Sequence, residues 1–535
     1  MDQDPSQEIR QENTPADEGT VERSSRKKTL GIPSWTLVLL TLVLAGVLVW
    51  AGNALIRSRQ RFPETRTESA VTASLSESPT PGDATPAPSV AASTRAPAPT
   101  EIVLPPTPVP PAQTVILVAE FEQPEEDSAQ VVEAAQTLYQ TLLARARSAG
   151  AADWAHIEQT SRIVTRESVV SAAEAHNAEC VLWGSGGEQR LNVYLSRIGR
   201  PPAGPLSSQA RQLSLSVPDE TLLCGAADMD AAASFVLGIA AYGRLRGRGE
   251  MEPARSWFRE TLDAAEGHAA ECESLLAHTY LYIGNVAALG GEYDAALTYY
   301  ETGLGLTSAA ADQALLYTNQ ASIYYAQEET DAALAAATLA VERAPDLANA
   351  YYHRANARRA QQEIEDAQSD LDRALALDPR HARAYASRGL LHHSINAFEE
   401  ALQDYARALE LDPWAAEVYL NRGGTYATLG DLDAAVQDYS LTLALQPDDA
   451  DAFYNRGTVY AIQQRYSEAL DDFSQALALR PDFSQVYGNR GLAYKALGER
   501  DAAIADFEAF LELSDNAQWR AMIEEQLREL EPAQE

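Results

Sequence analysis

Cysteine is scarce in this chain of 535 residues, with only Cys180, Cys224 and Cys272 present. Three cysteines cannot form a disulfide framework, and no CxxC pair or Cys/His cluster has the spacing of a metal site. We interpret them as buried thiols, with a single Cys224–Cys272 bridge left open for a domain outside the cytoplasm. We expect no metal and no cofactor.

Basic residues are also few, with 41 Lys and Arg against 77 Asp and Glu, a formal net charge of −36. A field of this sign repels phosphates, so nucleic acid and anionic membrane surfaces are disfavoured as partners. The acidic residues are spread over segments that also carry arginine, which indicates a role in solubility.

A catalytic constellation is missing as well. The glycine-rich stretch GSGGEQ at 184–189 lacks the Lys-Ser/Thr of a phosphate-binding loop, and no predicted helix follows it directly, so it is predicted to be a hairpin turn. His156 and His176 have no partner in a suggestive register. Without a nucleophile–base pair or nucleotide loop, the sequence does not predict an enzyme.

One long apolar run stands near the start. Trp35–Ile56 contains 22 residues without a charge, and a helix of that length rises about 33 Å, enough to cross a bilayer. Trp35 and Trp50 lie near its ends, as interfacial aromatics do. We predict a retained transmembrane helix over 30–56 rather than a cleaved signal peptide, because the run is long and no clear cleavage site follows.

The charges on either side of this run do not decide its orientation in the membrane, because four basic residues stand close to each end. Residues 1–29 are predicted to be a disordered cytoplasmic tail. Residues 57–113 are rich in Ser, Thr, Ala and Pro and form a semi-rigid linker. Stalks of this kind hold domains away from a membrane, so we place the repeats described below outside the cytoplasm; a cytoplasmic location is the alternative.

A small α/β domain is predicted over 114–225. Apolar runs predict strands at Thr114–Phe121, Cys180–Gly184 and Leu191–Ile198, and weaker patterns predict strands at Ile157–Val164 and Gln209–Val217. Helices are expected at Ala129–Ser148 and Ser168–His176. The segments ILVAEF, SVVSAAEAHNA and VLWGSGG before NVYLSRI resemble the TolB-N-like domain that precedes helical repeats in many bacterial signalling proteins. The resemblance implies a non-catalytic adaptor.

The remainder repeats with a period of 34 residues, marked by Pro345, Pro379, Pro413, Pro447 and Pro481. If each proline is position 32, position 8 is Gly or Ala, position 20 is alanine, and position 24 is mostly a large apolar residue. Small residues let two antiparallel helices approach, the large residue fills the space between units, and the proline ends the second helix.

These residues identify the segment as resembling the tetratricopeptide-repeat family, with NRG motifs in YLNRGGTY, FYNRGTVY and VYGNRGLAY. We predict about eight repeats over 226–535, closed by a capping helix at Ala517–Leu530. The fold class is therefore mainly α: a right-handed solenoid preceded by a small α/β domain and one transmembrane helix. The family implies a concave groove that binds peptides or protein surfaces.

Two polar rows run through the repeats. Arginine at position 7 and aspartate at position 23 are separated by 16 residues, which places them on the two helices of one hairpin. We predict structural ion pairs Arg354–Asp370, Arg388–Asp404, Arg422–Asp438, Arg456–Asp472 and Arg490–Asp506. A phosphate-binding arginine row is the alternative, and the matching aspartates argue against it.

The second row stands at position 6, which faces the groove in this family: Asn319, His353, Ser387, Asn421, Asn455 and Asn489. An asparagine amide can donate to and accept from the backbone of an extended peptide. Solvated polar residues are an equally good interpretation. Further groove candidates are Tyr352, Tyr454, Arg359, His393 and Lys495. Position 2 lacks the lysines that read chaperone C-termini, so such a tail is not the expected ligand.

The sequence therefore predicts a membrane-anchored scaffold whose groove binds an unidentified protein or peptide. Two alternatives stay open: a structural component of an envelope complex that associates with copies of itself, and a regulatory or sensory subunit of a signalling system.

Overall fold

The computed structural model describes residues 114–120, 128–149, 151, 155–163, 168–176, 178, 180–186, 191–197, 213–218, 220–223, 229–248, 251–265 and 272–530. The predicted tail at 1–29, the transmembrane helix at 30–56 and the linker at 57–113 lie outside these residues. In the part of the chain that is described, no helix is long and apolar enough to cross a membrane.

The first described part is a five-stranded sheet with the order β2-β1-β3-β4-β5. Strand β1 runs parallel to β2 and β3, whereas β4 is antiparallel to both β3 and β5. The strands are β1 Thr114–Glu120, β2 Ala155–Ile163, β3 Cys180–Gly186, β4 Leu191–Arg197 and β5 Glu220–Leu223, with helices α2 Ser128–Ser148 and α3 Val169–His176.

Alternation along β1 covers both faces of the sheet. Ile116 and Val118 pack with Leu138 of α2 in the larger core cluster. Leu117, between them, packs in a separate cluster that includes Ala172 of α3. The sheet therefore has a helix on each face, as an α/β unit requires.

The predicted fifth strand is wrong. The fifth strand of the sheet is β5, whereas residues 213–217 of the expected strand Gln209–Val217 belong to no strand. Their backbone groups bond to side chains of distant helices instead of a neighbouring strand. Alternating Leu and Ser in this segment satisfies either arrangement, so the pattern alone could not distinguish them.

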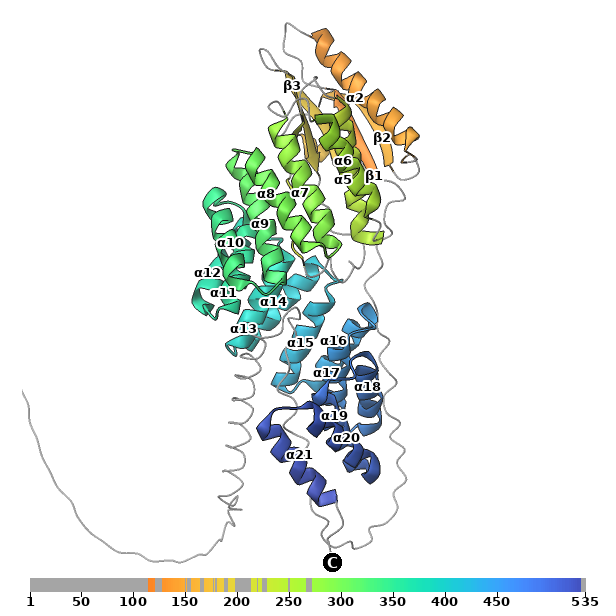
Figure 1. Ribbon diagram of the computed structural model, residues 1–535, viewed down its shortest axis with the longest axis vertical. Coiled ribbons are helices and arrows are strands. Elements are labelled where there is room, and N and C mark those ends of the chain that lie inside the picture. Colours follow the sequence, from red (N-terminus) through yellow and green to blue (C-terminus); the bar gives the residue numbers. More distant parts are fainter. Residues whose placement is uncertain are drawn as a thin grey trace, which may run out of the picture. The chain divides into compact units, whose positions relative to one another are not determined.

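From residue 229 to 530 the described chain forms helical hairpins (Figure 1). Helices α5 to α20 pair as eight antiparallel hairpins, followed by α21. The bounds are α5 Met229–Arg248, α6 Glu252–Ala265, α7 Glu273–Leu289, α8 Tyr293–Leu306, α9 Ala310–Ala326, α10 Thr330–Arg343, α11 Ala348–Ala360, α12 Ile364–Leu377, α13 Ala382–Ser394, α14 Phe398–Leu411, α15 Ala416–Leu429, α16 Leu432–Leu445, α17 Ala450–Ile462, α18 Tyr466–Leu479, α19 Ser484–Leu497, α20 Arg500–Leu513 and α21 Ala517–Leu530.

Glycine at position 8 is explained by the ring at position 24 of the same hairpin. A Cβ on Gly457 would lie 2.9 Å from Cε1 of Phe473, and one on Gly423 would lie 2.9 Å from the same atom of Tyr439. The first, less regular hairpin keeps this contact, because a Cβ on Gly238 would meet Phe258 at 2.6 Å. The close approach of the two helices therefore extends to the start of the array.

The turn inside most hairpins contains one residue in the left-handed backbone region, at position 15 of the repeat. Three hairpins place glycine there: Gly291, Gly430 and Gly498. Four place a residue with a side chain there: Glu328, Gln362, Asn396 and Gln464, with φ between 59° and 65°. The turn geometry is therefore common to these hairpins, whereas the residue that adopts it is not.

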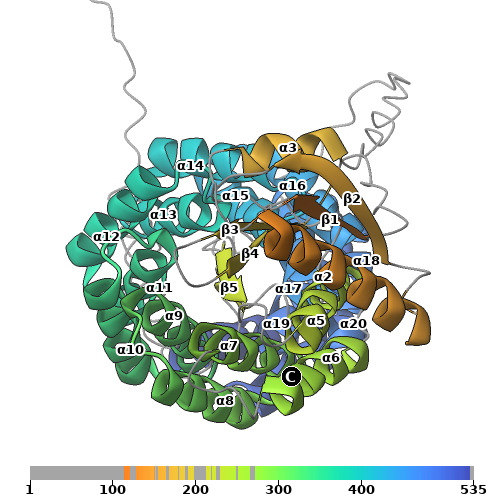
Figure 2. The same ribbon diagram turned by 90° about the horizontal axis from the view of Figure 1, so that it is seen from above.

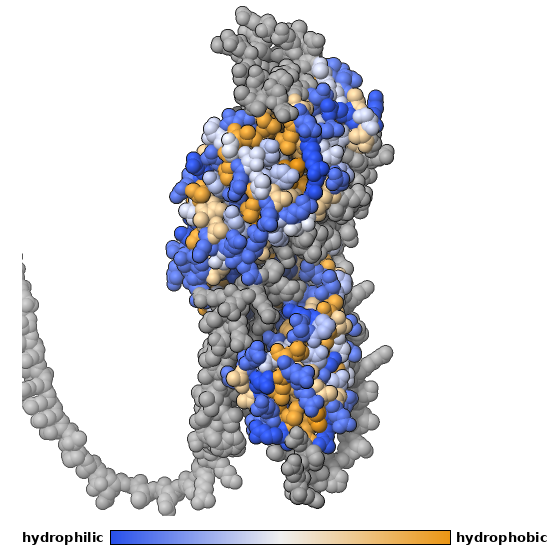
Figure 3. Space-filling model, in the orientation of Figure 1, coloured by the Kyte–Doolittle hydropathy of each residue, from blue (hydrophilic) through white to orange (hydrophobic). Residues whose placement is uncertain are grey.

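Helix α21 closes the array. Its Ile523 is fully buried in a cluster with Phe507 and Phe510 of α20, so this helix covers the apolar face that a further repeat would otherwise contact. On the face shown in Figure 3, hydrophilic residues surround the smaller hydrophobic areas of the repeats.

Candidate functional site

The first helices of successive hairpins line the inner side of the curve, where β5 also lies (Figure 2). Strand β5 contacts α7. Three first helices, α7, α9 and α11, hold the extended segment Leu213–Pro218, which we call the inner segment.

Asn319 of α9 binds the backbone of Ser216 through both ends of its amide. Oδ1 accepts from the Ser216 amide at 2.6 Å, and Nδ2 donates to the Ser216 carbonyl at 2.9 Å. Asn285 of α7 donates to the same carbonyl at 3.3 Å. Asn319 thus makes the two-way contact with an extended backbone that its residue type predicted, but the backbone belongs to this same chain.

Ser214, two residues earlier, is held in a similar way. Its amide donates to Oγ of Ser322 at 3.2 Å, and its carbonyl accepts from Nε2 of His353 at 2.8 Å. Asn349 of α11 donates to Oγ of Ser216 at 2.8 Å. Because a carbonyl only accepts, His353 carries its proton on Nε2 in this contact.

The pKa of His353 is lowered to about 3, mainly by burial and also by the nearby His381 and Arg383, against the carbonyl of Ser214. Burial likewise lowers the pKa of His381 to about 4. His381 donates from Nε2 to Asn349 Oδ1 at 2.7 Å, because its Nδ1 accepts from the Ala384 amide. Both rings are therefore neutral at pH 7, and protonation opposes this arrangement.

The other position-6 residues are also largely shielded from solvent. Asn421, Asn455 and Asn489 are 6%, 4% and 0% exposed, and Ser387 is half-buried. Asn489 donates at 3.3 Å to the hydroxyls of Tyr454 and Thr458, both in the preceding repeat. In this part of the row, Asn489 links neighbouring repeats.

The remaining groove candidates take different partners. Tyr352 packs against the rings of His353 and His381 at 5.0 Å. Arg359 donates to the Tyr325 hydroxyl, His393 lies 2.9 Å from Oγ1 of Thr425, and Lys495 pairs with Glu529 of α21. Only Tyr352 therefore adjoins the residues that hold the inner segment.

The Arg and Asp of every predicted ion pair lie within hydrogen-bonding distance, in the same two-pronged geometry. Nε and one terminal nitrogen of the guanidinium donate to the two carboxylate oxygens, at 2.6–2.9 Å in all five repeats. The aspartates are almost fully buried and the arginines about one-fifth exposed. Charge-assisted bonds of this form fix the angle between the two helices of a hairpin.

The third guanidinium nitrogen connects successive repeats. Nη1 of Arg388 donates to Asp372, and Nη1 of Arg456 and of Arg490 donate to Ser440 and Ser474. Each acceptor stands at position 25 of the preceding repeat. Rings at positions 4 and 11 flank Arg422, Arg456 and Arg490; Tyr419 and Tyr426, for example, lie 5.5 and 5.9 Å from Arg422.

The two repeats without an aromatic residue at position 11 place a basic residue there instead. Arg358 bonds to Asp370 at 2.7 Å, in addition to the arginine at position 7. Nδ1 of His392 lies 3.0 Å from Oδ2 of Asp404. These residues depart from the sequence pattern, but each contributes a further contact to the buried aspartate of its own repeat.

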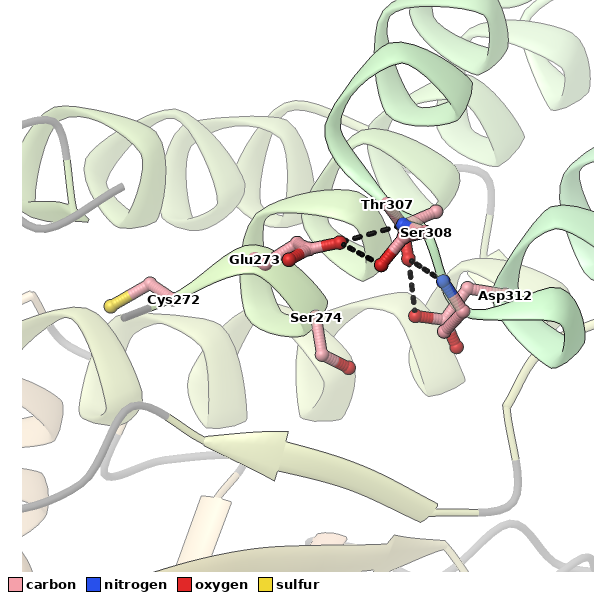
Figure 4. A pocket seen from close by; sticks show the side chains of 7 residues that line it. Cys272, Glu273, Ser274, Thr307, Ser308 and Asp312 are labelled. Atoms are coloured by element: carbon pink, nitrogen blue, oxygen red, sulfur yellow. Dashed lines mark hydrogen bonds between the residues drawn. The ribbon is translucent and has the colours of Figure 1, made fainter. Parts of the chain in front are cut away.

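An open pocket of about 340 Å³ lies where α7 begins and α8 leads into α9. Figure 4 shows Glu273 directed at Ser308 and Thr307 at Asp312. Glu273 accepts from the Ser308 amide and hydroxyl at 2.6 and 3.1 Å. These contacts tie the loop between α8 and α9 to α7.

Asp312, at one end of this pocket, bonds to the buried His278 at 3.0 Å and to Thr307 at 3.1 Å. Burial disfavours its charged form, but the bonds from His278 and Thr307 outweigh that effect and lower its pKa. Among the described residues, no group of three or more His, Cys, Asp or Glu side chains could hold a metal ion.

The cysteines have different states. Cys180 of β3 is a buried thiol, whereas Cys272, at the start of α7, is disulfide-bonded. Cys224, the partner considered from sequence, lies outside the described residues.

Three family models match the sequence. Two described as tetratricopeptide repeat match residues 450–483, and 348–381 with 484–516; one described as TPR repeat matches 389–430 and 425–464. The chain carries tetratricopeptide repeats. TPR arrays are generally non-enzymatic scaffolds for protein–protein interaction. None of these matches covers 114–225, so the comparisons do not support the TolB-N-like resemblance.

Several solved structures are similar to part of the chain. They include MamA (24% identity, 33% of this chain and 96% of MamA, TM-score 0.29) and pilF of Pseudomonas aeruginosa (18%, 41% and 99%, 0.38). A third is YrrB, described as a TPR protein with an unusual peptide-binding site (22%, 35% and 97%, 0.31). No curated protein matches. With TM-scores below 0.5, these likenesses add no argument about function.

Proposed function

We propose that this protein is a membrane-anchored TPR scaffold that binds an extended protein segment along the inner side of its repeats. The observation that carries the proposal is the contact of Asn319 with Ser216, at 2.6 and 2.9 Å. It supports the proposal because the amide reads groups that every peptide backbone has, so the same contact suits a segment of another protein.

Asn421, Asn455 and Asn489 extend this row into the later repeats. Their small exposed fractions mean that a guest must move neighbouring side chains to reach them. Oδ1 of Asn489 accepts no hydrogen bond from the described residues, and an unsatisfied buried acceptor costs about 1–3 kcal/mol. A guest amide that reached Oδ1 would remove this cost.

The test is a peptide-library selection against residues 114–535, followed by affinity measurement of the selected peptides. The triple variant Asn421→Ala, Asn455→Ala and Asn489→Ala should bind them at least tenfold more weakly, since each lost bond contributes roughly 1 kcal/mol. Arg407→Ala, which breaks an exposed pair with Glu410 on α14, is the matched control. Equal affinity in the wild type and the triple variant would exclude the position-6 row as the binding element.

We also propose that Trp35–Ile56 anchors the chain and that the repeats lie outside the cytoplasm. The disulfide at Cys272 supports this location, since such bonds persist mainly in oxidising compartments. Because Cys180 is a thiol and the chain has three cysteines, we propose Cys224 as the partner. Protease treatment of intact cells should cleave the repeats; protected repeats would reverse the orientation.

Self-association in an envelope complex and a regulatory role in signalling remain predictions from the sequence. A mass measurement on residues 114–535 at increasing concentration separates self-association from the scaffold role. Self-association raises the mass with concentration, whereas a scaffold for another protein keeps a constant mass when that protein is absent.

A further inference from the structure

The inner segment, Leu213–Pro218, is bound as a peptide ligand is bound. No backbone–backbone hydrogen bond joins it to other described residues. Its amides and carbonyls at Ser214 and Ser216 bond instead to side chains. A strand in a sheet satisfies its backbone with another backbone, whereas a peptide in a groove uses side chains of its receptor.

The side chains that hold the segment come from three successive repeats. Asn285 stands on α7, Asn319 and Ser322 on α9, and Asn349 and His353 on α11, between 69 and 139 residues along the chain from their partners. They contact Ser214 and Ser216, which stand two residues apart, as the period of two of an extended ligand requires.

The intervening residues supply apolar contacts. Leu213 and Leu215 are 3% and 7% exposed and pack in the cluster that contains Leu316 and Ile323 of α9. The inner segment therefore has leucine and serine at alternate positions. The serine side chains are small enough to let the backbone of the segment approach the helices.

We propose that Leu213–Pro218 is an internal ligand of the TPR array, and that the groove across α7, α9 and α11 is a site for extended segments with this Leu-Ser-Leu-Ser chemistry. The inference rests on the proposed function in that it names the partner chemistry of one part of the groove. A partner segment that enters there competes for the same Asn319 amide and must displace the inner segment.

The covalent link explains why a competitor is excluded while the segment is in place. A ligand tethered by a short stretch of chain has an effective concentration on the order of millimolar. A free peptide at micromolar concentration cannot displace it until the internal contacts are weakened. Displacement also affects the sheet, because β5 begins at Glu220, two residues after Pro218.

The experiment uses the full-length chain and a labelled peptide of residues 213–218 with blocked ends, followed by fluorescence anisotropy. The double variant Leu213→Ser with Leu215→Ser weakens the internal ligand and should bind the peptide about tenfold more tightly, or better, than the wild type. Adding Asn319→Ala should abolish the gain, whereas adding Arg407→Ala should not. A peptide of the same composition in the order Leu-Leu-Ser-Ser-Val-Pro should bind to neither.

Two results would overturn the proposal: no gain in the double variant, or a gain that survives Asn319→Ala. Hydrogen exchange in the wild type provides a test that needs no folded variant. An internal ligand opens locally, so the Ser214 and Ser216 amides should exchange at least tenfold faster than interior amides of α9. If these two amides were as protected from exchange as the interior amides of α9, the segment would be a permanent part of the core and not a ligand. Neither result depends on Asn421, Asn455 or Asn489, so the wider proposal is tested separately.

Discussion

Removal of Arg422 should destabilise the array more than removal of its partner. The side chain of Asp438 is 3% exposed and that of Arg422 is 20% exposed. Arg422→Ala leaves a nearly buried carboxylate without its cation, a change that costs about 3–5 kcal/mol. Asp438→Ala leaves a guanidinium that is partly hydrated and lies beside Tyr419 and Tyr426, so we expect about 1–3 kcal/mol.

The double variant Arg422→Ala with Asp438→Ala measures the interaction energy of the pair itself. With both groups gone no charge is stranded, so the cost should fall below the sum of the single variants by at least about 1 kcal/mol. Arg422→Lys keeps the charge but loses the two-pronged bond, and it should fall between wild type and Arg422→Ala. Urea unfolding of residues 114–535 gives the total, and hydrogen exchange should locate the loss in α15 and α16 rather than α11 and α12.

Acidification should reduce the cost of Arg422→Ala. Burial raises the pKa of Asp438 above its ordinary 3.8, against the bonds from Arg422. Without Arg422 that pKa rises further, so the folded variant takes up a proton that the unfolded chain does not. Its stability relative to wild type then recovers as the pH falls towards 3.8. Equal costs for the two single variants, or a cost independent of pH, would refute this reasoning.

Three further predictions concern other parts of the fold. Gly457→Ala should cost about 1–3 kcal/mol, because its Cβ would meet Phe473 at 2.9 Å, whereas Gly305→Ala, with nothing within 4 Å, should stabilise α8 by about 0.5–1 kcal/mol; thermal unfolding measures both, and equal effects would contradict the packing argument. His353 contributes stability that is present above its ordinary pKa of 6.5 and lost as the pH falls towards about 3. At about 1.4 kcal/mol per pH unit, His353 alone should lower the free energy of unfolding by about 3 kcal/mol between pH 6.5 and pH 4.5, and His353→Gln should remove that share while leaving the share that comes from His381. Reduction of the disulfide at Cys272 should lower stability by about 2–4 kcal/mol, and an unfolding midpoint unchanged by reductant would contradict this.

The hairpins were predictable from sequence because their determinants are local and repeated. The proline at position 32 and the glycine at position 8 act within one hairpin, so each of the regular repeats gives the same information again. The 16-residue separation of Arg422 and Asp438 predicts a contact for the same reason. The bonds from Arg388 to Asp372 and from Arg456 to Ser440 were not predicted, because they depend on how two repeats stack.

The inner segment could not be placed from sequence. An alternating Leu-Ser run predicts a strand, and nothing local in it indicates that an amide will meet Asn319 and a carbonyl will meet His353, more than 100 residues away. The position-6 row had the opposite difficulty. Its residue types predict contact with a backbone, but whether an asparagine meets a peptide, as Asn319 does, or a neighbouring repeat, as Asn489 does, depends on the residues opposite.

The left-handed residue in the hairpin turns has a practical consequence for thermostability. At Glu328, Gln362, Asn396 and Gln464 the backbone adopts a left-handed conformation that costs a residue with a side chain about 1–2 kcal/mol, whereas glycine there gives up only about 0.5–1 kcal/mol of chain entropy. Glycine should gain about 0.5–1 kcal/mol at Glu328, Gln362 and Gln464, and less at Asn396, because asparagine tolerates this region. Since each turn lies in a different repeat, the gains should add. A chain with glycine in all four turns should therefore melt several degrees higher, with every substitution confined to the turns between the helices.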